Sequence, residues 1–145
     1  MPKIMSSINV ISRCQTVYRS AELPGELSGA HHMYVYAICA KPGRSQEELA
    51  KDLHLNKSSV TRAITLLSER GFVRREQDGL DKRVIRVYPT EKMLDVLPRV
   101  RETSRKWTEL ISEGISEEEM EVFCSVLAKI TERAKSITED GGDNA

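Results

Sequence analysis

The sequence predicts a mainly helical fold that contains one small β-hairpin. Apolar residues recur at helical spacing over 4–21, 30–40, 45–69 and 90–137. The period changes over 72–88, where two short runs with the pattern of β-strands flank an Asp-Gly pair. The 145 residues are enough for one domain with a sizeable core and an additional arm that joins another subunit.

Two apolar helices are expected before residue 44. The first covers 4–21, where two apolar rows at helical spacing form a wide face, and Pro24-Gly25 ends it. The second covers 30–40 and is stopped by Lys41-Pro42-Gly43.

Two further helices with a short turn between them occupy the middle of the chain. Ser45 and Glu48 form a capping box, in which each side chain satisfies a backbone N–H of the first turn. Asn56 is the N-cap of a longer helix from Lys57 to about Glu69, and Gly71 is placed to end it. Its inner stripe consists of Val60, Ile64 and Leu67, and its outward residues are Ser58, Ser59, Thr61, Arg62 and Thr65.

A hairpin and two more helices complete the pattern. The strands are expected over 72–76 and 83–88, with the turn at Asp78-Gly79. Helices return at about Thr90, and Ser116 with Glu119 opens the last one through a second capping box. The polar tail 139–145 is expected to be disordered.

The uneven distribution of charge along the chain favours a protein that binds nucleic acid. The net charge is zero, but residues 44–88 carry 10 basic and 7 acidic side chains, whereas 89–145 carry 8 basic and 13 acidic ones. A basic middle beside an acidic tail is typical of a phosphate-facing module with a solvated support. No run is apolar enough for a membrane helix and no secretion signal is evident, so a cytoplasmic location is expected.

The order of elements predicts binding to double-stranded DNA. A helix fits the major groove, and hydroxyl and guanidinium groups near its start can meet base edges and phosphates. The positive end of the helix dipole at Lys57, Ser58 and Ser59 also favours a phosphate. The basic hairpin that follows is short enough to reach a neighbouring minor groove.

At these residues the chain resembles the MarR family of bacterial regulators, which are winged helix-turn-helix proteins. The resemblance rests on 45–50, on 56–62 and on 67–73, and continues through Asp81-Lys82-Arg83 to 90–92. It implies a dimerisation helix in 1–29, a DNA-binding domain in 30–89 and C-terminal dimerisation helices in 90–138. Pro89 and Met93 depart from the family pattern, where leucine and glycine are usual, at the junction of wing and helix.

The resemblance implies that Ser58, Ser59, Thr61 and Arg62 face the major groove. It further implies that Arg83 enters the minor groove, with Asp81 holding its guanidinium. The full set of expected DNA-contacting residues is Ser45, Lys57, Ser58, Ser59, Thr61, Arg62, Arg74, Asp81, Lys82 and Arg83. Alternatively, Asp81 and Arg83 form an ordinary surface ion pair, and the serines only cap the helix.

The family also implies a homodimer and an effector. The expected DNA-binding domain, residues 30–89, is called the reading head below. The first helix and the last two carry more apolar surface than the reading head can cover, which favours pairing of two subunits and a near-palindromic operator. Relatives are often released from DNA by small aromatic or acidic compounds, for which His31, His32, Tyr34 and Tyr36 are the candidate residues here. The alternative is that these four are core and helix-surface residues.

Other functions have less support. Cys14 lies roughly where peroxide-sensing relatives keep a reactive cysteine, although packing is the ordinary role of a helical cysteine. The three cysteines are too far apart for a disulfide framework or zinc ribbon, and no metal site or cofactor is expected. Motifs of catalysis are lacking, so the chain is not expected to be an enzyme; a winged-helix module that binds protein is the better alternative.

Overall fold

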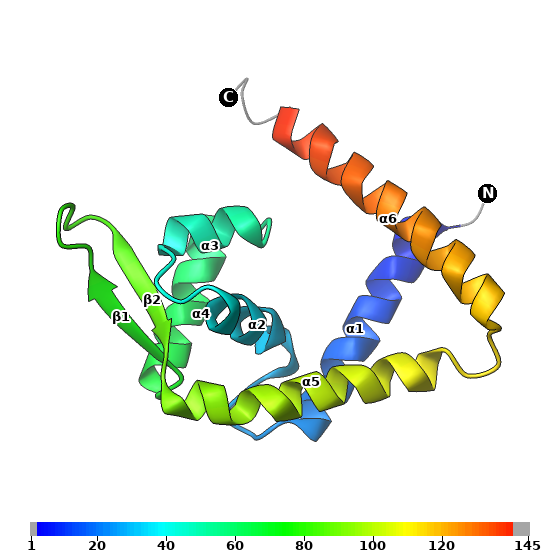
Figure 1. Ribbon diagram of the computed structural model, residues 1–145, viewed down its shortest axis with the longest axis horizontal. Coiled ribbons are helices and arrows are strands. Elements are labelled where there is room, and N and C mark those ends of the chain that lie inside the picture. Colours follow the sequence, from blue (N-terminus) through cyan, green and yellow to red (C-terminus); the bar gives the residue numbers. More distant parts are fainter. Residues whose placement is uncertain (1–2, 141–145) are drawn as a thin grey trace. The chain divides into compact units, whose positions relative to one another are not determined.

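The computed structural model describes residues 3–140 and confirms a mainly helical fold with a two-stranded hairpin (Figure 1). The chain divides into two compact units, Met1–Trp107 and Thr108–Ala145. The elements, in order, are α1 (Ile4–Glu22), a 3-10 turn (Gly29–His31), α2 (His32–Ala40), α3 (Gln46–Asp52), α4 (Lys57–Glu69), β1 (Val73–Gln77), β2 (Ile85–Pro89), α5 (Glu91–Ile111) and α6 (Glu117–Asp140). None of the helices within 3–140 is long and apolar enough to cross a membrane.

The predicted helix starts are present as local hydrogen bonds. Ser45 Oγ accepts from Glu48 N at 3.0 Å, and Glu48 Oε2 accepts from Ser45 N at 3.2 Å. Asn56 Oδ1 accepts from Ser59 N at 2.8 Å, and Ser116 and Glu119 form the second reciprocal pair. These caps satisfy backbone N–H groups that have no partner inside the helix.

The end of α4 leads directly into the hairpin. Gly71 has a φ of 81°, Gly71 N donates to Ser68 O, and Phe72 N donates to Leu67 O at 2.9 Å. This pair of bonds ends a helix with a left-handed residue, which glycine adopts without steric cost. Phe72 then turns into the core, and β1 begins at Val73.

The hairpin differs from the expected one at its turn. β1 pairs antiparallel with β2 from Val73 opposite Pro89 to Gln77 opposite Ile85, so each strand begins one or two residues later than expected. The loop runs over 78–84 and is not a tight Asp-Gly turn, because the Asp78 carboxylate accepts from both Leu80 N and Asp81 N. Residues 43–45 add a short third edge, since Gly43 N donates to Val87 O and Val87 N donates to Arg44 O.

The core lies between the helices α2, α3 and α4, the hairpin and the first half of α5. Val60, Ile64 and Leu67, the predicted inner stripe of α4, are all fully buried. Met93 is also fully buried and Pro89 is the last residue of β2, so the two departures from the family pattern fit the junction where α5 begins. The remaining core residues include Val35, Ile38, Leu49, Phe72, Val87 and Val100.

α1 is attached to this unit through its C-terminal half. Tyr18 packs on Trp107 with ring centroids 5.4 Å apart, and the Arg99 guanidinium donates to Glu22 O at 2.8 and 3.0 Å. Gly29 packs tightly against α1, since a Cβ there would lie 2.3 Å from Thr16 O. The division of the chain into functional regions stays a prediction. α6 continues to Asp140, into the tail expected to be disordered, and 141–145 lie outside the described residues.

The buried stripe of α4 gives a first prediction. Ile64→Ala should lower the free energy of unfolding by about 2–5 kcal/mol, because it leaves a cavity in a filled core. Leu80→Ala is the control and should stay within about 0.5 kcal/mol, because Leu80 is fully exposed. Urea unfolding at one protein concentration measures both, and an Ile64→Ala cost as small as that of the control would contradict this packing.

Candidate nucleic-acid interface

α4 presents its polar face outward because its apolar stripe is buried. Ser58, Thr61 and Arg62 are exposed, whereas Ser59 is half-buried and its backbone N–H is occupied by the Asn56 cap. Helical periodicity fixes this division, since residues that follow the buried positions at one or two steps must face the other side. The first two turns of α4 therefore carry hydroxyl and guanidinium groups on an open surface.

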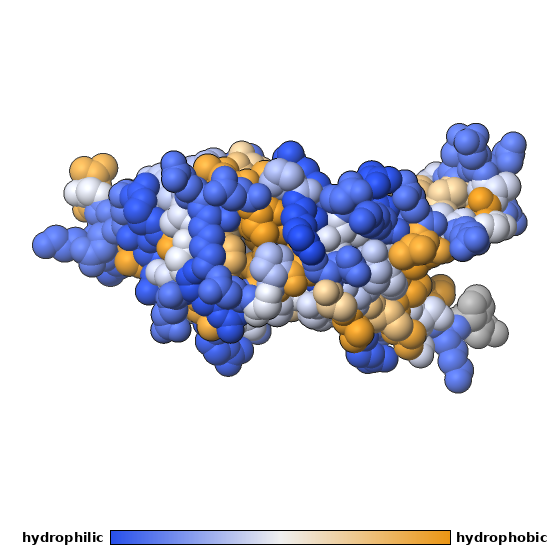
Figure 2. Space-filling model, turned by 90° about the horizontal axis from the view of Figure 1, so that it is seen from below, coloured by the Kyte–Doolittle hydropathy of each residue, from blue (hydrophilic) through white to orange (hydrophobic). Residues whose placement is uncertain are grey.

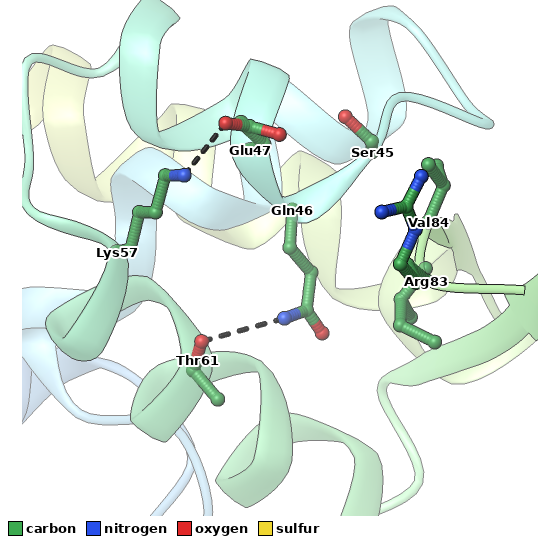
Figure 3. Close-up of a pocket in the computed structure, with 8 residues that line it drawn as sticks. Ser45, Gln46, Glu47, Lys57, Thr61, Arg83 and Val84 are labelled. Carbon is green, nitrogen blue, oxygen red and sulfur yellow. Dashed lines mark hydrogen bonds and ion pairs between the residues drawn. The ribbon is translucent and has the colours of Figure 1, made fainter. Parts of the chain in front are cut away.

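Three elements meet around a hollow of about 210 Å³ beside this turn (Figure 3). Lys57 and Thr61 of α4 lie on one side, and Arg83 of the wing lies on the other. Lys57 Nζ pairs with Glu47 Oε1 at 2.6 Å, and Gln46 Nε2 donates to Thr61 Oγ1 at 3.4 Å. The hollow is lined by Ser45, Gln46, Glu47, Lys57, Thr61, Arg83, Val84 and Ile85.

Two residues expected at the interface have other partners in the structure. Ser45 is buried, and its hydroxyl accepts the Glu48 N–H of the capping box. The Arg74 guanidinium lies 4.6 Å from the centroid of the Tyr88 ring and pairs with Glu76. DNA contact by either residue stays a prediction.

The wing carries Arg83 on an ordered support. Arg83 Nε lies 3.1 Å and Nη2 lies 3.3 Å from the two carboxylate oxygens of Asp81, which also accepts from Arg83 N at 3.0 Å. These hydrogen bonds hold the pKa of Asp81 below its usual value, so the carboxylate is ionised at neutral pH. The Arg83 side chain is 91% exposed, and Lys82 beside it is exposed too, so both cations face solvent.

Asp78 and Arg86 support the wing and were not found from the sequence. Arg86 Nε donates to Asp78 Oδ1 at 2.7 Å, and Arg86 Nη1 donates to Gly43 O at 2.9 Å. The Arg86 hydrogen bond is the main cause that lowers the pKa of Asp78. The signal in the sequence was an aspartate at the hairpin turn, but its partner across the strands has no local signature.

A second hollow, of about 580 Å³, lies among α1, α2, α5 and the segment before α3. Of the four candidate effector residues it includes His32 and Tyr36. Tyr34 is buried in the core, and His31 packs edge-on against Tyr34 with centroids 6.4 Å apart. The hollow is lined by Arg19, His32, Met33, Tyr36, Ala37, Ala40, Lys41, Arg44, Asp52, Leu53 and Ser104.

Arg19 is a buried charged residue of this hollow that the sequence did not indicate. It is 5% exposed, and its Nη2 donates to Ser104 Oγ at 3.0 Å. Within the part of the chain that the structure describes, Nε and Nη1 of Arg19 have no hydrogen-bond partner. Burial lowers the pKa of this guanidinium. Since a buried donor without an acceptor is costly, these groups are suited to an acidic molecule in the hollow.

The remaining candidates do not gather into a site. Cys14 is exposed on α1, which leaves its role in redox sensing untested. Among residues 3–140 no three side chains of His, Cys, Asp or Glu are grouped so that they could hold a metal ion.

The chain is similar in sequence and fold to known proteins. Residues 26–84 match the model of the MarR family. The uncharacterized HTH-type transcriptional regulator YybA of Bacillus subtilis (strain 168) is 28% identical over 131 residues, which are 90% of this chain and 87% of YybA. The crystal structure of the transcriptional regulator SlyA superposes with a TM-score of 0.86 at 26% identity, covering 93% of this chain and 96% of SlyA.

A third similar structure contains nucleic acid. It is a MarR family transcriptional regulator from Listeria monocytogenes complexed with a 26mer DNA. Its TM-score is 0.78 at 24% identity, with 92% of this chain and 89% of that one covered. At this identity the likeness shows a shared fold.

The two half-buried histidines predict a pH dependence of stability. Burial lowers the pKa of both His31 and His32 below 6.5. The stabilising effect of the neutral rings is complete above pH 6.5 and is lost as the pH falls toward the folded pKa values, because the unfolded chain takes up protons first. The melting temperature should therefore fall from about pH 7.5 to about pH 5.5.

Two variants identify the source of this dependence. The double variant His31→Asn, His32→Asn should flatten the decrease in melting temperature, and His54→Asn, at an exposed position, should leave it unchanged. An undiminished decrease in the double variant would contradict the assignment.

Proposed function

The chain belongs to the MarR family of transcriptional regulators, and from this premise we propose that it is a DNA-binding repressor that acts as a homodimer on near-palindromic operators. The observation that carries the proposal is the shared hollow between α4 and the wing. There the exposed first turn of α4 and the supported guanidinium of Arg83 face outward together.

In this proposal α4 lies in the major groove. Ser58, Thr61 and Arg62 provide donors and acceptors for base edges, and the helix start favours a phosphate. Lys57 and Glu47 form an ion pair on the surface. A DNA phosphate can replace Glu47 as the partner of Lys57, since exposed ion pairs are weak in water. Ser45 caps α3 through its hydroxyl, and Asn56 caps α4 by accepting the backbone N–H of Ser59, so Ser45 acts through the position of α3.

The wing would reach the adjacent minor groove. Arg83 is favoured there by the negative potential of the groove, and Asp81 keeps the guanidinium in one orientation. Lys82 adds a phosphate contact, so binding should weaken as the salt concentration rises. Arg74 stacks on Tyr88 and strengthens the base of the wing.

The unpartnered apolar faces of α1 and α6 support the homodimer. Among the described side chains of α6, which is 24 residues long, none is buried. A helix of this length with an apolar stripe gains its stability from packing, so a second subunit is the expected partner. Apolar side chains reach the surface at several places (Figure 2). Those of α1 and α6 are Ile4, Met5, Val10, Ile11, Val17, Val122, Phe123, Val126, Leu127, Ile130 and Ile137.

An acidic effector is proposed for the hollow at Arg19. A carboxylate there would accept from Nε and Nη1, and the rings of His32 and Tyr36 offer an aromatic wall. Tyr36 Oη lies 2.7 Å from Ser104 Oγ, the same hydroxyl that holds Nη2 of Arg19. Because α1 and the segment before α3 both line the hollow, an occupant would contact the expected dimer arm and the reading head together.

The DNA-binding proposal is tested by salt-dependent titration of a long mixed-sequence duplex. Arg83→Ala should weaken binding by about tenfold and lower the slope of log Kd against log salt by about 1.8, because each dimer loses two cations from the DNA interface. Arg133→Ala on α6 is the matched control and should leave both quantities unchanged. Equal binding by wild type and Arg83→Ala would contradict the proposed role of the wing.

The effector proposal is tested with benzoate and its neutral amide, benzamide. Benzoate at millimolar concentration should raise the melting temperature and release duplex from the wild type, whereas benzamide should do neither, because only the acid pairs with Arg19. Arg19→Gln should remain folded and lose the response. A response to benzoate that survives in Arg19→Gln, or equal action of the amide, would contradict the assignment.

A further inference from the structure

Leu80 at the tip of the wing is the most exposed of the large hydrophobic residues that the structure describes. Its relative exposure is 101%, and the next highest value is 72% at Val17 on α1. Most other exposed apolar residues belong to the helices α1, α5 and α6, where a partner subunit can cover them. Leu80 lies outside these helices, and the other apolar residue of its loop, Val84, lines the hollow beside α4. Association of subunits through helices therefore does not explain the exposure of Leu80.

The backbone that carries Leu80 is held in place. Asp78 Oδ2 accepts from Leu80 N and from Asp81 N, each at 3.1 Å. The other oxygen of Asp78 accepts from Arg86 Nε, and Arg86 is tied to Gly43 O at the edge of the reading head. Asp78 N donates to Val84 O, and Val84 N donates to Asp81 O, which closes the loop. The tip therefore presents Leu80 at a fixed position, and little conformational entropy is lost when it makes a contact.

The surroundings of Leu80 indicate what it contacts. Lys82 and Arg83 follow it after Asp81, which binds the Arg83 guanidinium, and Arg83 is the cation proposed to enter the minor groove. The walls of that groove consist of deoxyribose rings, whose C–H surface suits an apolar side chain. Minor-groove proteins also use leucine as a wedge between base steps, which shows that apolar side chains are accommodated there. One leucine among cations is too small for a stable protein interface, which needs a cluster of buried anchors.

We propose that Leu80 is an apolar DNA contact that packs against the minor groove beside Arg83 and adds affinity that does not depend on charge. The inference rests on the proposed function and assigns a role to a residue outside the polar set expected from the sequence. Asp78 and Arg86 are positioning residues, because they hold the loop that carries both Leu80 and Arg83.

The test compares Leu80→Ala and Leu80→Met with wild type on a duplex that the wild type selects from random sequence. Leu80→Ala should raise Kd by about fivefold to tenfold at every salt concentration, because burial of three apolar carbons is lost. The slope of log Kd against log salt should stay that of the wild type, since no charge has been removed. Leu80→Met, which keeps the apolar volume, should stay within about twofold.

Controls separate this inference from the proposed function. Leu94→Ala removes another exposed leucine, on α5, and should leave Kd unchanged; melting temperatures show that each variant is folded. Binding of Leu80→Ala within about twofold of wild type, or a loss accompanied by a lower salt slope, would overturn the role of Leu80 while leaving the DNA-binding proposal intact. A wild-type chain without salt-sensitive duplex binding would overturn the proposed function and this inference with it.

Discussion

The packing of the inner face of α4 is the interaction on which the rest of the structure depends. Val60, Ile64 and Leu67 are fully buried, and their burial fixes both the axial rotation of the helix and the position of its first turn. Because the apolar face of α4 is buried in the core, the hydroxyl and guanidinium side chains on the opposite face are exposed to solvent. The same helix ends at Gly71, so the wing begins at a defined point and direction relative to the reading helix.

The segment 43–45 connects the two hollows described above. The Arg44 side chain lines the hollow that contains Arg19, and Arg44 O accepts from Val87 N in β2. Gly43 O accepts from Arg86 Nη1 on the wing, and Ser45 caps α3 and lines the hollow beside α4. Three consecutive residues thus contact the proposed effector hollow, the wing and the start of α3. An occupant that touches Arg44 would therefore contact a residue adjacent in sequence to those that contact the wing and α3.

Local features of the fold could be predicted from the sequence, because the residues that create them lie within a few positions of each other. The capping boxes at Ser45 and Ser116, the cap at Asn56 and the helix end at Gly71 are all of this kind. The burial of the α4 stripe followed from helical periodicity alone. Each of these predictions is confirmed by the hydrogen bonds and exposures of the described residues.

Features that depend on distant pairs could not be predicted. Arg19 acquires its meaning only when Ser104 of α5 and the ring of Tyr36 lie beside it. The Asp-Gly pair correctly indicated a hairpin but not the length of its loop. The Asp78 carboxylate accepts a hydrogen bond from Arg86 of β2, and this contact has no local signal in the sequence. The pairing of 43–45 with β2 likewise has no periodic signal, because only a few residues take part.

The central claim is that two copies of α4, brought together by the apolar helices, read one face of a duplex in register. Selection from a random duplex library by the purified full chain, at near-physiological salt, tests it most directly. The account predicts enrichment of a near-palindrome whose half-site centres lie about one helical turn, ~34 Å, apart. Enrichment of a single unrepeated half-site, or of no sequence at all, would contradict it.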